Sequence, residues 1–378
     1  LSLAQCLCLP AEHVEALRTT QASHYQTLPG QVTARWSSFV GNQPVVLVRS
    51  VQHARRALLR ALAVAPGEPV LLPANATDKL VEAVKQTGAR ALFGELDERL
   101  ALTSLSTQRV IWAEPVAGLP LAVNASSGIV VADYATSAPI GKAEQDADVA
   151  LYGLHLSVHT DEAGALLVFR DPALAERMTK QLQGKDQPDW QRAARQLERL
   201  EALAQQQQTA LQQVWLGLHE AAGLALLSFH TASALAHGVA VQIPAESVPS
   251  TFYIYARSEN TPVVWLPELR PLHHSALTTC PQTAAHLERW LLVPVQPSDH
   301  EAAVAHAVLG IVKAAEYLGV RWRTNPARAA TYAALLAEKY GPDHDAYRPV
   351  FALPRPTLDA SALSIEHFTP TSCRVVFA

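Results

Sequence analysis

The sequence between Val45 and Phe169 constrains the fold most, because short apolar runs alternate there with segments of helical periodicity. Such alternation is typical of βαβ units, which build a largely parallel sheet with helices on its faces. We therefore expect an α/β fold with a mostly parallel seven-stranded sheet. The predicted strands are Val45–Val48, Val70–Leu72, Arg90–Phe93, Val110–Ala113, Ile129–Ala132, Val149–Tyr152 and Ala165–Phe169. Helices are predicted at His53–Ala63 and at Asp78–Thr87, which ends at Gly88 in a C-cap position.

The second half of the chain predicts a long helix and a smaller α+β domain. Leu and Ala recur with Gln, Arg and Glu at helical spacing from Asp189 to about Leu227, which indicates a helix that joins two domains. Beyond it we predict strands at Phe252–Ala256 and Val263–Leu266, and helices at Gln282–Leu291, His300–Leu318 and Pro326–Tyr340. The expected division is a large domain over 1–185 with an N-terminal arm over 1–40, an interdomain helix over 186–227, a small domain over 228–320 and an extension over 321–378.

Composition excludes several classes of protein. Hydrophobic residues make up 49% and charged residues 17% of 378 residues, as in a compact globular protein. The net charge of −4 leaves no basic stripe for nucleic acid. No apolar run reaches the roughly 18 to 20 residues that span a bilayer, and the first residues lack a basic signal-peptide region, so we expect a cytoplasmic protein without a membrane partner. The four scattered cysteines, Cys6, Cys8, Cys280 and Cys373, are expected to be reduced.

Eight stretches, read in order along the chain, carry a resemblance to a known family. They are Gly30-Gln31-Val32 with Trp36, Phe39 and Gly41; Pro66 to Pro73; Glu114 to Pro120; Val130 to Ala135; Asp148 to His155; Glu162 to Ala165; Ala193 to Leu200; and Leu292 to Val295. Together they resemble the DegT/DnrJ/StrS sugar aminotransferases, vitamin B6 enzymes of fold type I, over roughly residues 25 to 320. The resemblance implies a PLP-dependent transferase fold, a nucleotide-sugar substrate and a homodimer.

The resemblance also implies a lysine that binds pyridoxal phosphate and an acidic residue that keeps the pyridine nitrogen protonated. Asp133 matches the acidic residue, at the carboxyl end of a predicted strand. The segment that should supply the lysine contains none: counting from its start places Val158 there, and counting from the Glu162 turn places His159 there. Lys142 and Lys180 lie on other predicted elements.

The phosphate-binding part of the resemblance is altered as well. The family binds the phosphate at a helix N-terminus after a Ser-Gly-Thr run, whereas this chain has Ser50-Val51-Gln52. Gly153 replaces a serine that the family has on the strand before its lysine. The segment between Gln183 and Trp190 is shorter than the corresponding segment of the family. If pyridoxal phosphate binds, the expected contacts are Asp133, Ser50, Gln52, Thr136 and His155, and His273 falls near the expected substrate loop.

Three hypotheses follow from these departures. In the first, the chain is a homologue without transaminase activity, which binds no cofactor and uses the former cleft for another ligand or a partner protein. In the second, His159 transfers protons on an unanchored B6 cofactor, as in sugar dehydratases of this family. In the third, the chain is a nucleotide-sugar aminotransferase whose lysine is misaligned. We expect no metal site, because His155 and His159 do not share a helical face.

Overall fold

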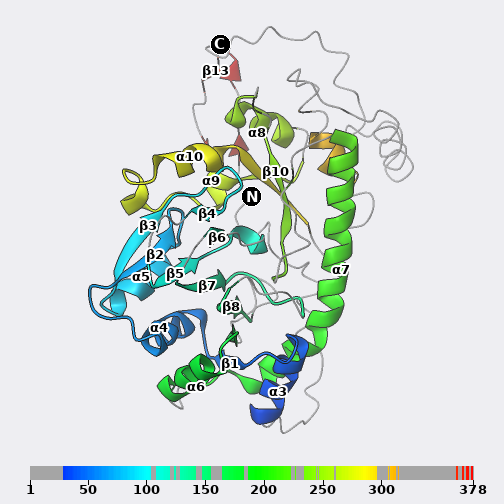
Figure 1. Ribbon diagram of the computed structural model, residues 1–378. Helices are drawn as coiled ribbons and strands as arrows, with labels where there is room; N and C mark the ends of the chain where they lie inside the picture. Colours follow the sequence, from blue (N-terminus) through cyan, green and yellow to red (C-terminus); the bar gives the residue numbers. More distant parts are fainter. Residues whose placement is uncertain are drawn as a thin grey trace.

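A computed structural model defines the architecture (Figure 1). The described residues are 29–103, 108–119, 123–124, 128–141, 147–154, 164–182, 186–222, 226, 234–243, 245, 247–258, 261–295, 305, 307–311, 314, 363–364, 368–369, 372–373 and 376–377. The predicted lysine-position residues Val158 and His159, together with His155, lie outside them. So do Cys6, Cys8 and the predicted helix Pro326–Tyr340.

The predicted seven-stranded sheet is present, and all seven predicted strands belong to it. Its order is β1-β9-β8-β7-β5-β2-β3. Strand β9 pairs antiparallel with both β1 and β8, and every other pairing is parallel, so β9 alone runs against the rest of the sheet. The strands are β1 (Val45–Val48), β2 (Pro69–Pro73), β3 (Arg90–Gly94), β5 (Val110–Ala113), β7 (Ile129–Tyr134), β8 (Val149–Gly153) and β9 (Ala165–Phe169).

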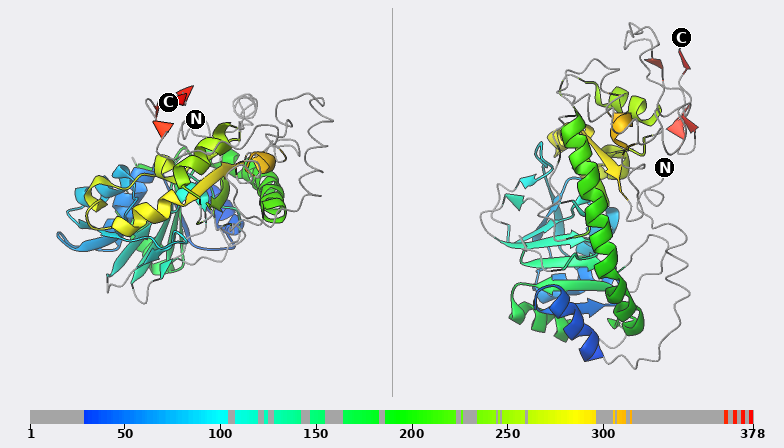
Figure 2. Two further views of the ribbon diagram at one scale, coloured as in Figure 1. Left: turned by 90° about the horizontal axis from the view of Figure 1, so that it is seen from above. Right: turned by 90° about the vertical axis from the view of Figure 1, so that its right-hand side faces the viewer.

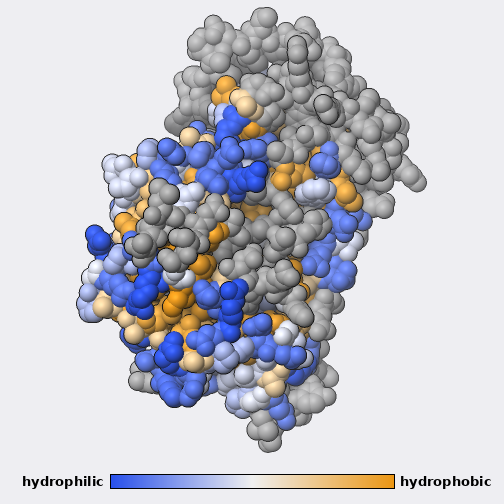
Figure 3. Space-filling model, viewed as in Figure 1, coloured by the Kyte–Doolittle hydropathy of each residue, from blue (hydrophilic) through white to orange (hydrophobic). Residues whose placement is uncertain are grey.

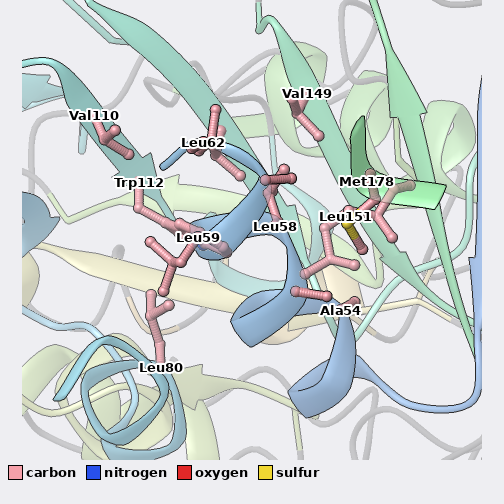
Figure 4. Packing of buried hydrophobic residues seen from close by; sticks show 14 of the residues in the cluster. Ala54, Leu58, Leu59, Leu62, Leu80, Val110, Trp112, Val149, Leu151 and Met178 are labelled. Carbon is pink, nitrogen blue, oxygen red and sulfur yellow. The ribbon is translucent and has the colours of Figure 1, made fainter. Parts of the chain in front are cut away.

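The sheet is apolar on both faces because helices or a second sheet cover each face. Along β5, Val110 and Trp112 point to the face covered by α4 (Val51–Ala61), α5 (Asp78–Gln86) and α6 (Pro172–Gln181), whereas Ile111 and Ala113 point to the other. The first face is closely packed, with Leu58, Leu59 and Leu80 fully buried against the strands (Figure 4). Each such side chain contributes about 1.5–3 kcal/mol by burial.

Capping residues set the ends of α4 and α5, the two helices that begin beside the carboxyl edge of the large sheet. The Ser50 hydroxyl accepts a hydrogen bond from His53 N at the start of α4, and the Thr77 hydroxyl does the same for Leu80 N at the start of α5. Gly88 follows α5 with a φ of +83°, the left-handed conformation that glycine adopts without strain at a helix end. These ends place the first turns of α4 and α5 beside the carboxyl edge of the sheet.

The opposite face of the large sheet is covered by α3 (Pro29–Phe39), the long helix α7 (Trp190–Ala222) and a smaller sheet (Figures 1 and 2). The predicted long helix is thus present as α7. The smaller sheet has the order β10-β12-β11, with antiparallel pairs throughout. Its strands are β10 (Gly238–Gln242), β11 (Val264–Trp265) and β12 (Trp290–Pro294). Side chains of this sheet, among them Leu292, pack with Leu71 and Ile111 of the large sheet.

One predicted strand is wrong. Phe252–Ala256 lies within helix α8 (Pro249–Ser258), which begins with a proline in its first turn. Phe252, Tyr253 and Ala256 are its buried residues, and this spacing matches one face of a helix. The aromatic and β-branched residues of the run suggested a strand, but the packing of that face against the small sheet decides the outcome.

The remaining described elements are short or partial. Helix α9 (Leu266–Leu269) and helix α10 (Pro281–Glu288) follow β11, and strands β4 (Leu102–Thr103) and β6 (Val123–Asn124) form a parallel pair. The four C-terminal strands β13 (Leu363–Ser364), β14 (Phe368–Thr369), β15 (Ser372–Cys373) and β16 (Val376–Phe377) form two antiparallel pairs.

Within the described part of the chain, no helix is both long and apolar enough to cross a membrane. On the face seen in Figure 1, hydrophobic residues reach the surface over the large sheet among hydrophilic ones (Figure 3).

Candidate functional site

Charged side chains converge at the carboxyl edge of the parallel strands. Thr77 lies shortly after β2, Glu114 directly follows β5, and Asp133 is the penultimate residue of β7. Because these strands are parallel neighbours, their carboxyl ends meet at one edge, which is where open α/β sheets bind ligands. Glu114 is 5% exposed and Asp133 is 1% exposed, so both carboxyl groups must find their partners within the protein.

Asp133 is surrounded by hydrogen-bond donors. Its Oδ2 accepts from Arg55 Nε at 2.7 Å and from Trp112 Nε1 at 2.9 Å. Its Oδ1 accepts from the backbone N of Ala135 at 3.1 Å. All three partners are donors, which is the arrangement that suits an ionised carboxylate.

Arg55 joins the two buried carboxylates. It comes from α4, one turn inside the helix, and its side chain is 3% exposed. While Nε donates to Asp133, Nη2 donates to Glu114 Oε1 at 3.0 Å. The guanidinium is therefore held by two carboxylates, one near the end of β7 and one directly after β5.

Glu114 has further partners from two other parts of the chain. The backbone N and the hydroxyl of Thr77 donate to it, both at 2.8 Å. Arg270 Nη1 lies 2.8 Å from Glu114 Oε2, although it is not aligned for a regular hydrogen bond, and we treat the contact as an ion pair. Arg270 follows α9, so this contact links the region of the small sheet to the edge of the large one.

Burial and charge act in opposite directions on the acidic members of this network. Burial is the largest influence on Asp133 and raises its pKa; Arg55 opposes that effect and the charge of Glu114 adds to it. Burial would also raise the pKa of Glu114, but the charges of Arg270 and Arg55 and the hydrogen bonds from Thr77 outweigh it, so the pKa is lowered. For Arg55, the two carboxylates outweigh the effect of burial and raise its pKa. The network contains two arginines and two carboxylates, so its charges balance.

The start of α4 is the second part of the candidate site. Ser50 caps the helix, and Gln52 donates through its side chain to Lys79 O at 3.1 Å. His53 Nε2 lies 3.6 Å from Asp186 Oδ1. The N-terminus of α4 favours an anion, but the carboxylate of Asp186 already lies beside its first turn.

The structure places the other predicted contact residues as follows. Thr136 comes two residues after β7, and its carbonyl oxygen lies 2.8 Å from His237 Nε2, just before β10. Gly153 ends β8 and is buried. His273 is buried with its ring stacked on Phe93, and its backbone N donates to Ala74 O next to β2. Asp133 and Thr136 thus lie at or just after the end of β7, and Ser50 and Gln52 lie at the start of α4. His273 contacts Ala74, just after β2.

A cluster of Asp78, His273 and His274 has three possible ligand atoms within 4.8 Å of one another. The hydrogen bonds of His273 argue against a metal there. Its Nδ1 accepts from Ser275 N at 3.1 Å, so in the neutral ring Nε2 carries the proton and faces Asp78 Oδ1 at 3.4 Å. A metal at Nε2 would require that proton to leave and the Ser275 hydrogen bond to break.

Sequence reasoning missed Arg55, Glu114 and Arg270. One signal was available for Arg55, because it lies four residues after Val51 and three before Leu58, on the apolar face of its helix. Glu114 directly follows a buried strand, at a position where a charge requires a partner. Nothing in the sequence marks Arg270 as a partner of Glu114.

The fold and this edge define a class: the chain has the fold of PLP-dependent aminotransferases. No protein-family model matches the sequence, and no curated protein matches it. The similar solved structures include the aminotransferase TlmJ from Streptoalloteichus hindustanus, at 19% identity and a TM-score of 0.61 over 82% of this chain and 98% of that one. They also include the putative sugar aminotransferase Spr1654 from Streptococcus pneumoniae, at 16% identity and a TM-score of 0.61 over 82% and 97%. A third is S. venezuelae DesV in complex with a ketimine intermediate, at 19% identity and a TM-score of 0.60 over 81% and 95%.

These structures contradict the expectation that no cofactor is bound. Spr1654 is known in a PLP form and a PMP form, and a GDP-4-keto-6-deoxymannose-3-dehydratase of this fold holds a PLP-glutamate geminal diamine. The cofactor to which the comparisons point is therefore pyridoxal phosphate, and the first of the three hypotheses is wrong in that respect.

Proposed function

We propose that this chain binds pyridoxal phosphate at the carboxyl edge of its large sheet and does not act as a transaminase. The pairing of Asp133 with Arg55 is the observation that carries the proposal. Transamination needs a pyridine ring that accepts electrons, and a carboxylate that bonds a protonated ring nitrogen supplies this property. In this chain the matching carboxylate already has an internal cation as its partner.

The described residues fit the cofactor in part. The first turn of α4, with its Ser50 cap, offers a helix N-terminus of the kind that binds phosphate, and Asp133, near the end of β7, contacts the same helix through Arg55. Two features fit less well: Asp186 lies beside the first turn of α4, and the Oδ2 atom of Asp133 has two donors already. When bound, pyridoxal phosphate supplies an aldehyde and an electron-accepting ring. The start of α4 would hold its phosphate, and the pairing of Asp133 with Arg55 would limit the ability of the ring to accept electrons.

The sequence adds a second support. No lysine occurs between Lys142 and Lys180, a stretch that contains the segment expected to carry the Schiff-base lysine. Because this stretch lacks the expected lysine, we infer that non-covalent contacts hold the cofactor. Phosphate contacts at α4 would then provide most of the affinity.

Borohydride trapping followed by mass spectrometry tests this proposal. Protein equilibrated with pyridoxal phosphate is dialysed to measure binding, and a second portion is reduced and digested. We expect measurable binding with no pyridoxyl group on any lysine. Absence of binding would refute the cofactor assignment, and a single stoichiometric adduct on any one lysine, Lys142 and Lys180 included, would refute the non-covalent mode.

A further inference from the structure

We infer that Arg55 is a positioning residue that withholds Asp133 from the cofactor, so that the ring nitrogen of bound pyridoxal phosphate stays unprotonated. The inference rests on the proposed function, since it concerns a ligand at the same edge. It assigns a role to a residue that no resemblance pointed to. The structure supports it in three ways.

The first support is the hydrogen-bonding capacity of Asp133. Each carboxylate oxygen accepts about two hydrogen bonds in good geometry. Oδ2 accepts from Arg55 and Trp112, and Oδ1 accepts from Ala135 N. Both acceptor positions of Oδ2 are thus filled, so a protonated ring nitrogen would have to displace Arg55 or Trp112 there. The remaining position is on Oδ1, beside the N–H group of Ala135.

The second support is the charge balance. Asp133 and Glu114 together carry two negative charges, and Arg55 and Arg270 carry two positive ones. A proton on the ring nitrogen would add a positive charge next to the Arg55 guanidinium, and both carboxylates of this network are already paired with arginines. Like charges in a buried site repel strongly, so the neutral pyridine is the favoured form.

The third support is that Arg55 is fixed. Its guanidinium is held by Asp133 on one side and by Glu114 on the other, and Glu114 is held in turn by Thr77 and Arg270. A guanidinium has only N–H donors, so it can bond a ring nitrogen only if that nitrogen keeps its lone pair. Arg55 thus keeps Asp133 occupied, and any bond that it made to the ring would favour the same unprotonated form.

The test is the 15N resonance of ring-labelled pyridoxal phosphate bound to the full chain, which distinguishes pyridine from pyridinium nitrogen. Three proteins are compared: wild type, the double variant Arg55→Leu/Glu114→Gln, and Arg60→Leu as a matched control from the exposed face of the same helix. The double variant removes one positive and one negative charge, so the buried charges stay balanced. Circular dichroism and thermal melting establish that each variant is folded.

We expect the pyridine signal in wild type and in Arg60→Leu, and the pyridinium signal in the double variant, where Asp133 is freed. A pyridinium signal in wild type would overturn the inference and leave cofactor binding intact. A pyridine signal in the double variant would also overturn it, because Arg55 would not be the cause. If the double variant does not fold, Arg55→Gln/Glu114→Gln, which keeps a polar side chain at position 55 and the same charge balance, takes its place with the same expected and contradicting signals.

Failure of cofactor binding has a separate signature. If wild type binds no pyridoxal phosphate but the double variant binds it with a pyridinium signal, the proposed function fails. The role of Arg55 is then confirmed, because its hold on Asp133 prevents the cofactor from binding at all. If neither protein binds the cofactor, both statements fail, since freeing Asp133 would then make no difference.

Discussion

Replacing Arg55 by leucine should destabilise the protein by an amount set by the buried carboxylates that it leaves behind. The side chains of Arg55, Glu114 and Asp133 are 3% exposed or less, so water cannot replace the lost guanidinium. Asp133 would lose its ion pair with Arg55, and among the described residues Glu114 would keep its ion pair with Arg270. Breaking a buried pair by removing one member costs about 3–5 kcal/mol. That is a large part of the roughly 5–15 kcal/mol by which a protein of this kind is stable.

The loss of stability in Arg55→Leu should depend on pH and should be smaller at lower pH. Burial raises the pKa of Asp133, and Arg55 opposes that effect. In Arg55→Leu the folded-state pKa of Asp133 therefore rises further above its unfolded value, and the folded protein binds a proton more readily than the unfolded one. The destabilisation should be full above that raised pKa and should shrink as the pH falls through it.

Urea denaturation at pH 7.5 and pH 5 measures both effects. The control Arg60→Leu changes an exposed residue of the same helix and should alter the free energy of unfolding by no more than about 0.5 kcal/mol. The charge-balanced variant Arg55→Leu/Glu114→Gln should lose less free energy of unfolding than Arg55→Leu alone. A loss below about 1 kcal/mol for Arg55→Leu at pH 7.5, or a loss that grows at pH 5, would refute the reasoning about the buried network.

Three further predictions concern the rest of the molecule. Burial, and then the charge of His274, lower the pKa of His273, so its contribution to stability should be present above about pH 6.5 and lost as the pH falls through the lower folded pKa; His273→Gln should flatten the dependence of the melting temperature on pH in this range. Gly118→Ala should destabilise by about 1–3 kcal/mol in urea denaturation, because φ is +73° and a Cβ would lie 2.3 Å from Leu235 O, whereas Gly30→Ala, with nothing within 4 Å, should not destabilise. We also propose a homodimer, because hydrophobic residues reach the surface on one face (Figure 3); light scattering should give twice the 40.8 kDa chain mass, and a 40.8 kDa particle at micromolar concentration would contradict it.

Most strands of the large sheet could be predicted because they are short apolar runs buried on both faces, as Val110–Ala113 illustrates; Arg90–Gly94, at the edge of the sheet, is only partly buried. The reversed direction of β9 could not, since its apolar run reads the same in either direction. Phe252–Ala256 was predicted as a strand and is a helix, because the run is too short for its periodicity to decide against aromatic and β-branched composition.

The candidate site was predicted in part. Asp133 could be selected because it matches the acidic residue that the family resemblance implies, and the structure places it, buried, near the end of β7; its role as a cofactor contact stays a prediction. Its pairing with Arg55, 78 positions away, and the contact of Glu114 with Arg270 depend on how distant elements pack, and local sequence carries no record of that. A charged residue on an apolar helix face indicates that a partner is needed but does not identify it.

The most direct test of the central claim is the half-reaction with L-glutamate. Wild type, Val158→Lys and His159→Lys are each loaded with pyridoxal phosphate and mixed with excess L-glutamate, and pyridoxamine phosphate and 2-oxoglutarate are measured by chromatography. The two variants supply an amine at either of the positions expected for the lysine, but they leave Asp133 paired with Arg55. Groups that act as a unit recover little when one is restored alone. The account predicts no product above the protein-free blank in any of the three; stoichiometric pyridoxamine phosphate from wild type, or turnover in either variant, would contradict it.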